Sequence, residues 1–78
     1  NYDLTYHAIE EMADDGLGTF DIEKAILNGK LVKIDKNDPL GNKYIFRGVG
    51  GDKFTPIGVV GRFKETGVFL IITVYAIT

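Results

Sequence analysis

The spacing of apolar residues changes once along this chain, near Lys30, from a helical period to an alternating one. Before that residue, apolar side chains recur every three or four positions; after it, they alternate with polar side chains in short runs bounded by glycine, proline and asparagine. Helical and extended segments that follow one another without interleaving are typical of α+β folds. The order of the two segments therefore predicts helices that cover one face of an antiparallel sheet.

Two helices are predicted before Lys30. Thr5 can cap the first through its side-chain oxygen, and Gly16 can end it in the left-handed conformation. Thr19 can cap the second, which ends at Asn28 and Gly29. The residues expected to face the core are Leu4, Ala8, Ile9, Met12 and Leu17 in the first helix and Phe20, Ile22, Ala25 and Ile26 in the second.

Four strands are predicted after the helices, at Leu31–Ile34, Lys43–Val49, Ile57–Phe63 and Val68–Ile77. The segments between the first three strands, NDPLGN and GGDKFTP, are rich in residues that form turns. A chain of 78 residues cannot divide its apolar surface between two cores, so residues 1–78 are expected to form a single domain. The predicted fold is α+β, with two N-terminal helices on one face of a four-stranded antiparallel sheet in the order ααββββ.

The residue types that are missing exclude several kinds of chemistry. The chain has no cysteine, which favours a cytoplasmic location and excludes thiol catalysis and zinc–thiolate sites. It has no serine for a catalytic triad, and its one histidine, His7, has no second histidine with which to bind a metal. The longest apolar run, Val68–Ile72, is too short to cross a membrane. We therefore expect no cofactor, no metal and no membrane contact, and His7 is either a general acid or base or a structural residue.

Charge is distributed unevenly along the chain. Residues 1–23 contain seven Asp and Glu and no Lys or Arg, whereas residues 24–78 contain all nine Lys and Arg and four acids. The basic part can present a cationic face to a polyanion although the net charge of the whole chain is −2. The alternative is that both sets are solvated surface side chains.

The last two strands predict which side chains share a face of the sheet. If Lys64–Gly67 is a four-residue loop, Phe63 faces Val68, and residue 62 pairs with 69, 60 with 71 and 58 with 73. One face then suits the helices and contains Ile57, Val59, Phe63, Val68, Leu70, Ile72 and Val74. The other face is mixed and contains Gly58, Val60, Arg62, Phe69, Ile71, Thr73 and Tyr75.

The strand Lys43–Val49 adds two more cations to the mixed face. Packing Tyr44 and Phe46 against the helices leaves Lys43 and Arg47 on the opposite side. There, arginine is suited to bidentate phosphate contacts, and tyrosine can stack on a base or donate a proton. The side chains predicted to gather on the face away from the helices are Lys43, Arg47, Arg62, Thr73 and Tyr75.

Each of these residues also has a structural interpretation. Arg62 can cover apolar surface and pair with Glu65 or with an acid of the first helix. Lys43 and Arg47 can belong to an ordinary solvated edge. Tyr75 can be a core aromatic residue with a solvated hydroxyl. The functional interpretation therefore depends on whether these side chains converge.

Several stretches of the sequence resemble one bacterial family. The pieces YHAIEEMADDGL, DIEKAILNGKLVKI, GNKYIFRGVG, VVGRF and LIITVY follow the order found in the domain-of-unknown-function family numbered 4258. That family is similar in layout to the RelE, BrnT and MqsR ribonuclease toxins, and its members are often encoded beside small zinc-finger antitoxins. The resemblance implies a RelE-like fold that cleaves mRNA, on the ribosome or free, without a metal, and a zinc-finger antitoxin as a possible partner.

The sequence also departs from the pattern of that family. The family usually has arginine at the positions of Glu11 and Asp15, so two positive charges become negative. If those arginines bind RNA, their loss affects activity; if they contact a partner, the partner differs. The residues that match polar, recurrent positions of the family are His7, Lys43, Tyr44, Arg47, Arg62, Thr73 and Tyr75.

The first functional hypothesis is an endoribonuclease toxin of the RelE and MqsR class. The RNA 2′-hydroxyl would attack the adjacent phosphate while Arg62 and Arg47 stabilise the developing charge. Lys43 or His7 would act as the base, and Tyr75 as the acid or as a stacking platform. The residues expected to bind RNA are Arg47, Lys43, Thr73 and Tyr44.

Two other hypotheses belong to different classes. The chain can be a non-catalytic module that binds a protein through its acidic helix and edge strands. A homodimer that pairs the exposed faces of Val68–Ile77 belongs to this class. The chain can also bind RNA without cleaving it, which predicts a steep dependence of affinity on salt and no cleavage products.

Overall fold

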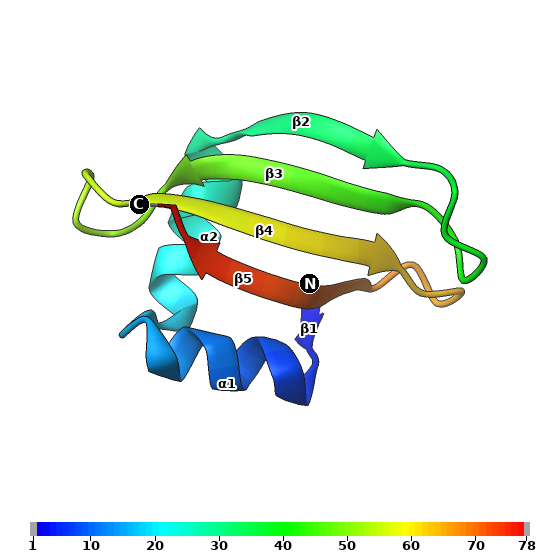
Figure 1. Ribbon diagram of the computed structural model, residues 1–78, viewed down its shortest axis with the longest axis horizontal. Helices are drawn as coiled ribbons and strands as arrows, with labels where there is room; N and C mark the ends of the chain where they lie inside the picture. Colours follow the sequence, from blue (N-terminus) through cyan, green and yellow to red (C-terminus); the bar gives the residue numbers. More distant parts are fainter. Residues whose placement is uncertain (1, 78) are drawn as a thin grey trace.

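A five-stranded sheet carries two helices on one of its faces in the computed structural model, which describes residues 2–77 (Figure 1). The elements are β1 (Tyr2–Leu4), α1 (Tyr6–Asp14), α2 (Thr19–Asn28), β2 (Lys30–Asp35), β3 (Lys43–Val49), β4 (Pro56–Phe63) and β5 (Phe69–Ala76). The strand order is β1-β5-β4-β3-β2, and every neighbouring pair is antiparallel except β1 and β5. The predicted α+β fold is confirmed, and β1 adds a short edge strand that the sequence pattern did not indicate.

Both helices begin and end at residues with recognisable capping chemistry. The Thr5 side-chain oxygen accepts a hydrogen bond from the Ala8 amide at 3.1 Å, and Gly16 follows α1 with φ of +68°. The cap of α2 is Gly18 and not the predicted Thr19; the Asp21 carboxylate accepts a hydrogen bond from the Gly18 amide at 2.9 Å. Within residues 2–77, neither helix is long and apolar enough to span a membrane.

The core lies between the helices and strands β4 and β5. Its buried residues are Ala8, Met12, Ile22, Ala25, Ile57, Val59, Ile71 and Val74. Two residues predicted to face the core are instead exposed, Ile9 at 48% and Phe20 at 59%. The reason is that α1 and α2 each bury only two residues, so the apolar stripe that meets the sheet is narrower than the sequence pattern suggests.

Side chains of α1 and of its two capping residues continue the hydrogen bonding of β5 beyond the end of β1. The Thr5 hydroxyl donates to the Ile72 carbonyl at 3.1 Å. Farther along, the Glu11 carboxylate accepts from the Val74 amide at 3.3 Å, and the Asp15 carboxylate accepts from the Ala76 amide at 3.1 Å. The helix therefore takes the place of an outer strand and covers the edge of β5.

The end of α2 is held close against β3. The Asn28 side chain accepts a hydrogen bond from the Val49 amide at 3.0 Å and donates one to the Val49 carbonyl at 3.1 Å. A Cβ placed on Gly48 would lie 2.1 Å from the Ala25 carbonyl oxygen, so the close approach of helix and strand requires glycine at residue 48.

The predicted register between the last two strands is wrong. Phe63 pairs with Phe69 because Val68 belongs to the loop, where its carbonyl accepts from the Lys64 amide at 2.8 Å. A β-bulge then leaves Ile72 as an extra residue between the pairs that involve Gly61 and Val60. As a result, the helix side of β5 holds Phe69 and Ile71, whereas Leu70 lies on the other side.

Candidate nucleic-acid interface

The face of the sheet that the helices leave uncovered, called the open face here, carries three rows of side chains across β2, β3, β4 and β5. Residues that pair in antiparallel strands point to the same face, so each row follows from the register. Row one is Lys30, Arg47, Gly58 and Tyr75; row two is Lys33, Ile45, Val60 and Thr73; row three is Asp35, Lys43, Arg62 and Leu70.

The open face combines a cationic border with an apolar middle. Its five cationic side chains come from three strands and are accompanied by one carboxylate of β2 and one from the following loop. The five residues that the sequence predicted to gather there do so: Lys43, Arg47, Arg62, Thr73 and Tyr75. Such a surface suits the sugar-phosphate backbone of a nucleic acid better than a second apolar layer.

Row one contains the most accessible group of functional side chains. The Tyr75 ring lies over Gly58, because a Cβ on Gly58 would be 2.2 Å from the ring carbon Cζ. Arg47 pairs with Gly58 from the other neighbouring strand and is exposed. Arg47 and Tyr75 therefore pair with Gly58 from its two neighbouring strands, and Lys30 follows at the sheet edge. The Tyr75 ring occupies the space above the glycine, so a ligand would meet the phenol and the exposed Arg47 side chain at the surface of the sheet.

Row three is partly neutralised by a carboxylate from the loop between β2 and β3. Asp38 Oδ2 lies 2.9 Å from Lys43 Nζ and 3.3 Å from Arg62 Nη2. The hydrogen bond from Lys43, followed by that from the Leu40 amide, holds the pKa of Asp38 below its ordinary value of 3.8. Arg62, with 16% of its side chain exposed, therefore pairs with a loop residue and not with Glu65 or an acid of α1.

Asp38 changes the chemistry that Lys43 and Arg62 can offer. Lys43 contacts Asp38 as an ammonium donor, so its charged group is already occupied by a carboxylate. Arg62 Nε is buried and has no hydrogen-bond partner among the residues that the structure describes. These two residues supply positive potential at the end of the open face, whereas Arg47 is the arginine exposed to a ligand.

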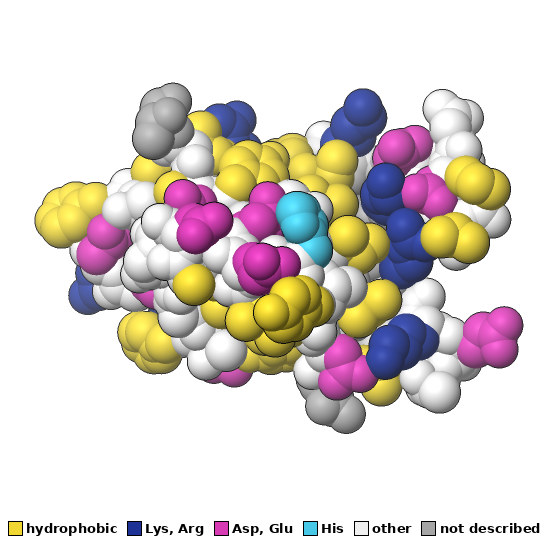
Figure 2. Space-filling model, turned by 60° about the horizontal axis from the view of Figure 1, so that its bottom comes forward, with side chains coloured by type: hydrophobic (Ala, Val, Ile, Leu, Met, Phe, Trp, Pro, Cys, Tyr) yellow, Lys and Arg dark blue, Asp and Glu magenta, His cyan; other side chains and the backbone are white. Residues whose placement is uncertain are grey.

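Carboxylates gather on α1, whereas the loop end of the molecule carries charges of both signs. Figure 2 shows carboxylates gathered over α1 beside the histidine, and Lys and Arg gathered at the end of the molecule that carries the loops after β2 and β4. The carboxylates on α1 or directly after it are Glu10, Glu11, Asp14 and Asp15. The acids of α1 thus form an acidic surface, but the two parts of the sequence do not separate fully in space, because Asp3 lies 2.6 Å from Lys64 and Asp38 pairs with Lys43 and Arg62.

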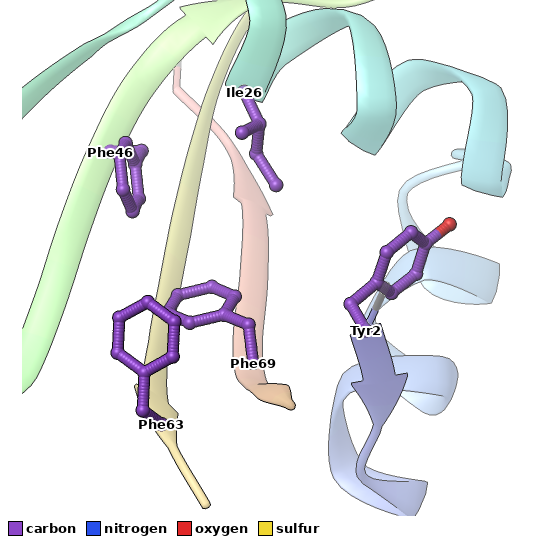
Figure 3. A pocket seen from close by; sticks show the side chains of 5 residues that line it. All are labelled: Tyr2, Ile26, Phe46, Phe63 and Phe69. Atoms are coloured by element: carbon purple, nitrogen blue, oxygen red, sulfur yellow. The ribbon is translucent and has the colours of Figure 1, made fainter. Parts of the chain in front are cut away.

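A groove on the helix side of the sheet is a second surface feature, which the sequence reasoning missed. It has a volume of about 240 Å³ and is lined by Tyr2, Ile26, Phe46, Phe63 and Phe69 (Figure 3). A ten-residue helix is about 15 Å long and an eight-residue strand about 26 Å, so α2 cannot cover the whole length of β4. Comparing the lengths of the predicted elements could have indicated this groove.

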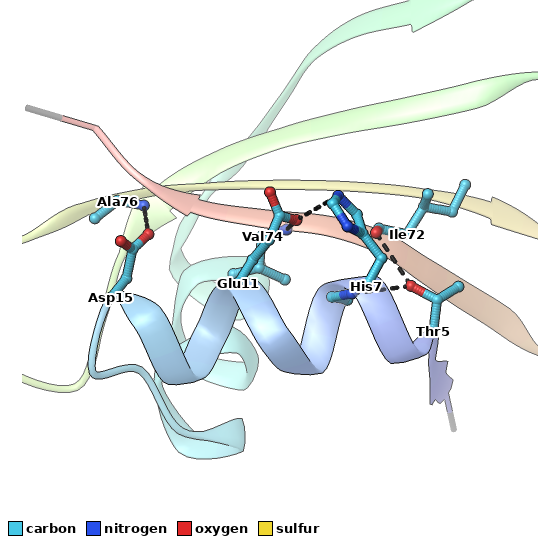
Figure 4. A network of polar contacts seen from close by, with 8 residues as sticks. Thr5, His7, Glu11, Asp15, Ile72, Val74 and Ala76 are labelled. Carbon is cyan, nitrogen blue, oxygen red and sulfur yellow. Dashed lines mark hydrogen bonds and ion pairs between the residues drawn. The ribbon is translucent and has the colours of Figure 1, made fainter.

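Two predicted site residues lie away from the open face. Tyr44 pairs with Gly61 on the helix side, and its ring centroid is 5.5 Å from that of Phe63. His7 lies on α1, where its Nε2 is 3.3 Å from Glu11 Oε1, beside the edge of β5 (Figure 4). The structure therefore does not bring Tyr44 or His7 together with Arg47. In the part of the chain that the structure describes, no three His, Cys, Asp or Glu side chains gather closely enough to hold a metal ion.

Two short helices on one face of a mostly antiparallel sheet, with a cationic open face on the other side, define the class of this small α+β domain. The chain belongs to the family described as Domain of unknown function (DUF4258), which matches residues 4–76 and confirms the resemblance to that family. No curated protein and no solved structure matches the chain.

Proposed function

We propose that this chain binds single-stranded RNA on its open face and cleaves it, as a ribonuclease toxin of the RelE and MqsR class would. The proposal rests on row one, where an exposed arginine and a phenol lie on the two sides of Gly58. Arg47 and Lys30 would bind consecutive phosphates, and the ring of Tyr75 would stack on a base. Lys33 and Thr73 of row two extend the contact along the strands.

The proposed reaction is a transesterification within the RNA. The 2′-hydroxyl oxygen forms a bond to the adjacent phosphorus, and the bond from phosphorus to the 5′ oxygen breaks. A base takes the proton of the 2′-hydroxyl, and an acid gives a proton to the leaving 5′ oxygen. Arg47 would stabilise the charge on the phosphoryl oxygens, and the Tyr75 hydroxyl would be the acid. Neither predicted base is placed to take the proton of the 2′-hydroxyl, because His7 lies on α1 away from the open face and Lys43 is held by Asp38, so a solvent water molecule would accept it.

The experiment compares charge reversals on the two sides of the sheet. Arg47→Glu on the open face and Lys24→Glu on α2 change the net charge equally, but Lys24 lies over the ring of Phe20 on the helix side. Purified protein is incubated with labelled single-stranded RNA, and binding and cleavage are measured at several salt concentrations. We expect Arg47→Glu to abolish cleavage and to lower the salt slope of binding by about 1, with Lys24→Glu close to the wild type.

A third variant separates binding from cleavage. Tyr75→Phe keeps the stacking ring and removes the proton donor, so it should retain RNA affinity and lose most of the cleavage rate. If the wild type binds RNA with steep salt dependence but yields no products, the chain is an RNA-binding domain without catalytic activity. If the wild type binds no RNA at low salt, the proposal is wrong.

The second candidate function is a non-catalytic module that binds a protein, and the helix-side groove favours it. Phe63 at the rim of this groove is 58% exposed, and aromatic rings of this kind often anchor protein interfaces. Phe63→Ala should then weaken binding to a neutralising partner protein, whereas Arg47→Glu should leave it unchanged. The opposite pattern would assign partner binding to the open face.

A further inference from the structure

The outer edge of β2 is an unpaired strand edge. β2 is the last strand in the sheet order, and among residues 2–77 no strand lies on its outer side. Its apolar side chains are accessible: Leu31 is 45%, Val32 53% and Ile34 38% exposed. An edge strand with exposed apolar side chains can pair with a strand of another chain.

A bulge at Val32 divides β2 into two halves. Because of the extra residue, the side chains after the bulge alternate between the two faces of the sheet in the opposite phase to those before it. Leu31 pairs with Phe46 and Lys33 with Ile45, so Val32 is an extra residue opposite β3. Lys30 precedes the bulge and Lys33 follows it, and both lie on the open face. The full assignment is Lys30, Lys33 and Asp35 on the open face and Leu31 and Ile34 on the helix side.

We propose that β2 pairs antiparallel with β2 of a second copy of this chain, with Lys30 opposite Asp35 and Leu31 opposite Ile34 of that copy. This is the register that pairs all six residues of the strand, and in it Lys30 shares a face with Asp35 and Leu31 shares a face with Ile34. In a regular strand without the bulge, Lys30 and Asp35 would lie on opposite faces of the sheet, and so would Leu31 and Ile34. The two-fold symmetry produces each pair twice, so two ion pairs and two apolar pairs stabilise the interface.

The same register brings two like charges close to the symmetry axis. Lys33 lies next to the centre of the strand on the open face, so the Lys33 side chains of the two copies are diagonal neighbours. Together with the small area of a single strand pair, this repulsion gives a weak dimer, with a Kd of about 10–100 µM. Lysines and bulges on an edge strand commonly prevent two sheets from joining. Here Lys30 is paired with Asp35 of the other copy, and the bulge places the paired side chains on the same face. Neither feature therefore prevents the proposed pairing.

Disulfide trapping tests the register directly, because the chain contains no cysteine of its own. The double variant Leu31→Cys/Ile34→Cys should form a covalent dimer under mild oxidation, since cross-strand partners meet the distance requirement of a disulfide. The single variants should remain monomeric on a non-reducing gel. A disulfide formed by Ile34→Cys alone would place Ile34 against itself and overturn the proposed register.

Charge variants test the interface by sedimentation velocity without RNA, so the result does not depend on the proposed RNA activity. Lys30→Asp should weaken dimerisation about tenfold, and Lys30→Asp/Asp35→Lys should restore it. Lys33→Gln should strengthen dimerisation, because it removes the repulsion at the axis. Circular dichroism confirms that each variant is folded. A wild type that stays monomeric at about 1 mM with no trapped dimer would overturn the proposal, as would crosslinking only to a different protein.

Discussion

The phenol ring of Tyr75 lies over Gly58, and the three atoms nearest to a Cβ on residue 58 are two carbons of this ring and its hydroxyl oxygen. The absence of a side chain at residue 58 therefore decides where the ring lies. Arg47 of β3 pairs with the same glycine, so Gly58 also affects how far the Tyr75 phenol lies from the strand that carries Arg47. The proposed RNA site is thus built around a residue that contributes no side chain.

Gly58→Ala should displace the ring and lower the free energy of unfolding by about 1–3 kcal/mol, because the added methyl group overlaps Tyr75. In a Tyr75→Ala background the methyl group has space, so the same substitution should cost much less. Urea unfolding of the four proteins in this double-mutant cycle measures the coupling. Equal effects of Gly58→Ala in both backgrounds would show that the ring is not the obstacle.

Gly48→Ala should be more damaging than Gly58→Ala. A Cβ on Gly48 would meet the Ala25 carbonyl oxygen at 2.1 Å and the Ala25 carbonyl carbon at 2.8 Å, and helix backbone cannot turn aside as a tyrosine ring can. We expect a loss of about 3 kcal/mol or more in the free energy of unfolding. Urea unfolding of the two alanine variants compares them, and an equal or smaller loss for Gly48→Ala would contradict the close packing of α2 on β3.

Asp38 should make stability depend on pH in the acid range. The pKa of Asp38 is lowered in the folded state, chiefly by the Lys43 hydrogen bond. The ionised carboxylate therefore contributes fully to the free energy of unfolding above the ordinary pKa of about 4. This contribution is lost as the pH falls through the lower pKa of the folded state. Asp38→Asn should therefore be less stable than the wild type at pH 7, with the difference shrinking below about pH 4. Urea unfolding across this range measures it. Glu65→Gln, which changes an exposed acid of the loop between β4 and β5, serves as the control.

The same substitution should increase RNA affinity. Asp38→Asn leaves Lys43 and Arg62 without their carboxylate partner, so two cations of row three become available to phosphates. We expect tighter binding of single-stranded RNA and a salt slope that is steeper by about 1. Affinity measured at several salt concentrations tests this prediction, and weaker binding by Asp38→Asn would mean that Asp38 positions these cations for RNA.

For the last two strands, the face of the sheet on which a side chain lies could be predicted more reliably than the residue with which it pairs. Near the loop, each partner on β5 lies one residue farther along than predicted, which moves Phe69 and Ile71 to the helix side. After the bulge the offset becomes two residues, and a shift of two restores the face. Thr73 and Tyr75 therefore lie on the predicted side although their pairing partners differ from the predicted ones.

The parts of the candidate site that the sequence did not indicate depend on contacts between distant segments. Asp38 and Arg62 are separated by 24 residues, and no local pattern connects a loop acid to a strand two positions away in the sheet. Alternation placed Lys43 and Arg47 correctly because β3 is regular over its whole length. β1 is only three residues long, too short for its alternation to be distinguished from a helix start.

Glu11 provides the last prediction, because the resemblance to the family implies arginine at its position. Its carboxylate accepts a hydrogen bond from the Val74 amide at 3.3 Å, on the part of the β5 edge that lies beyond β1, since β1 pairs only with Phe69–Ile71. Arginine has no acceptor, so Glu11→Arg should leave this amide without its partner and cost about 1–2 kcal/mol, whereas Glu11→Gln keeps an acceptor oxygen and should cost less.

Hydrogen exchange of the Val74 amide distinguishes this explanation from a general effect of charge on α1. Exchange should be faster in Glu11→Arg than in Glu11→Gln, while Glu10→Arg, on the exposed side of the same helix, should leave it unchanged. Equal protection in all three variants would show that Glu11 does not hold the strand edge. In that case the acids of α1 would be free to serve a partner, as the alternative interpretation of the departure from the family pattern requires.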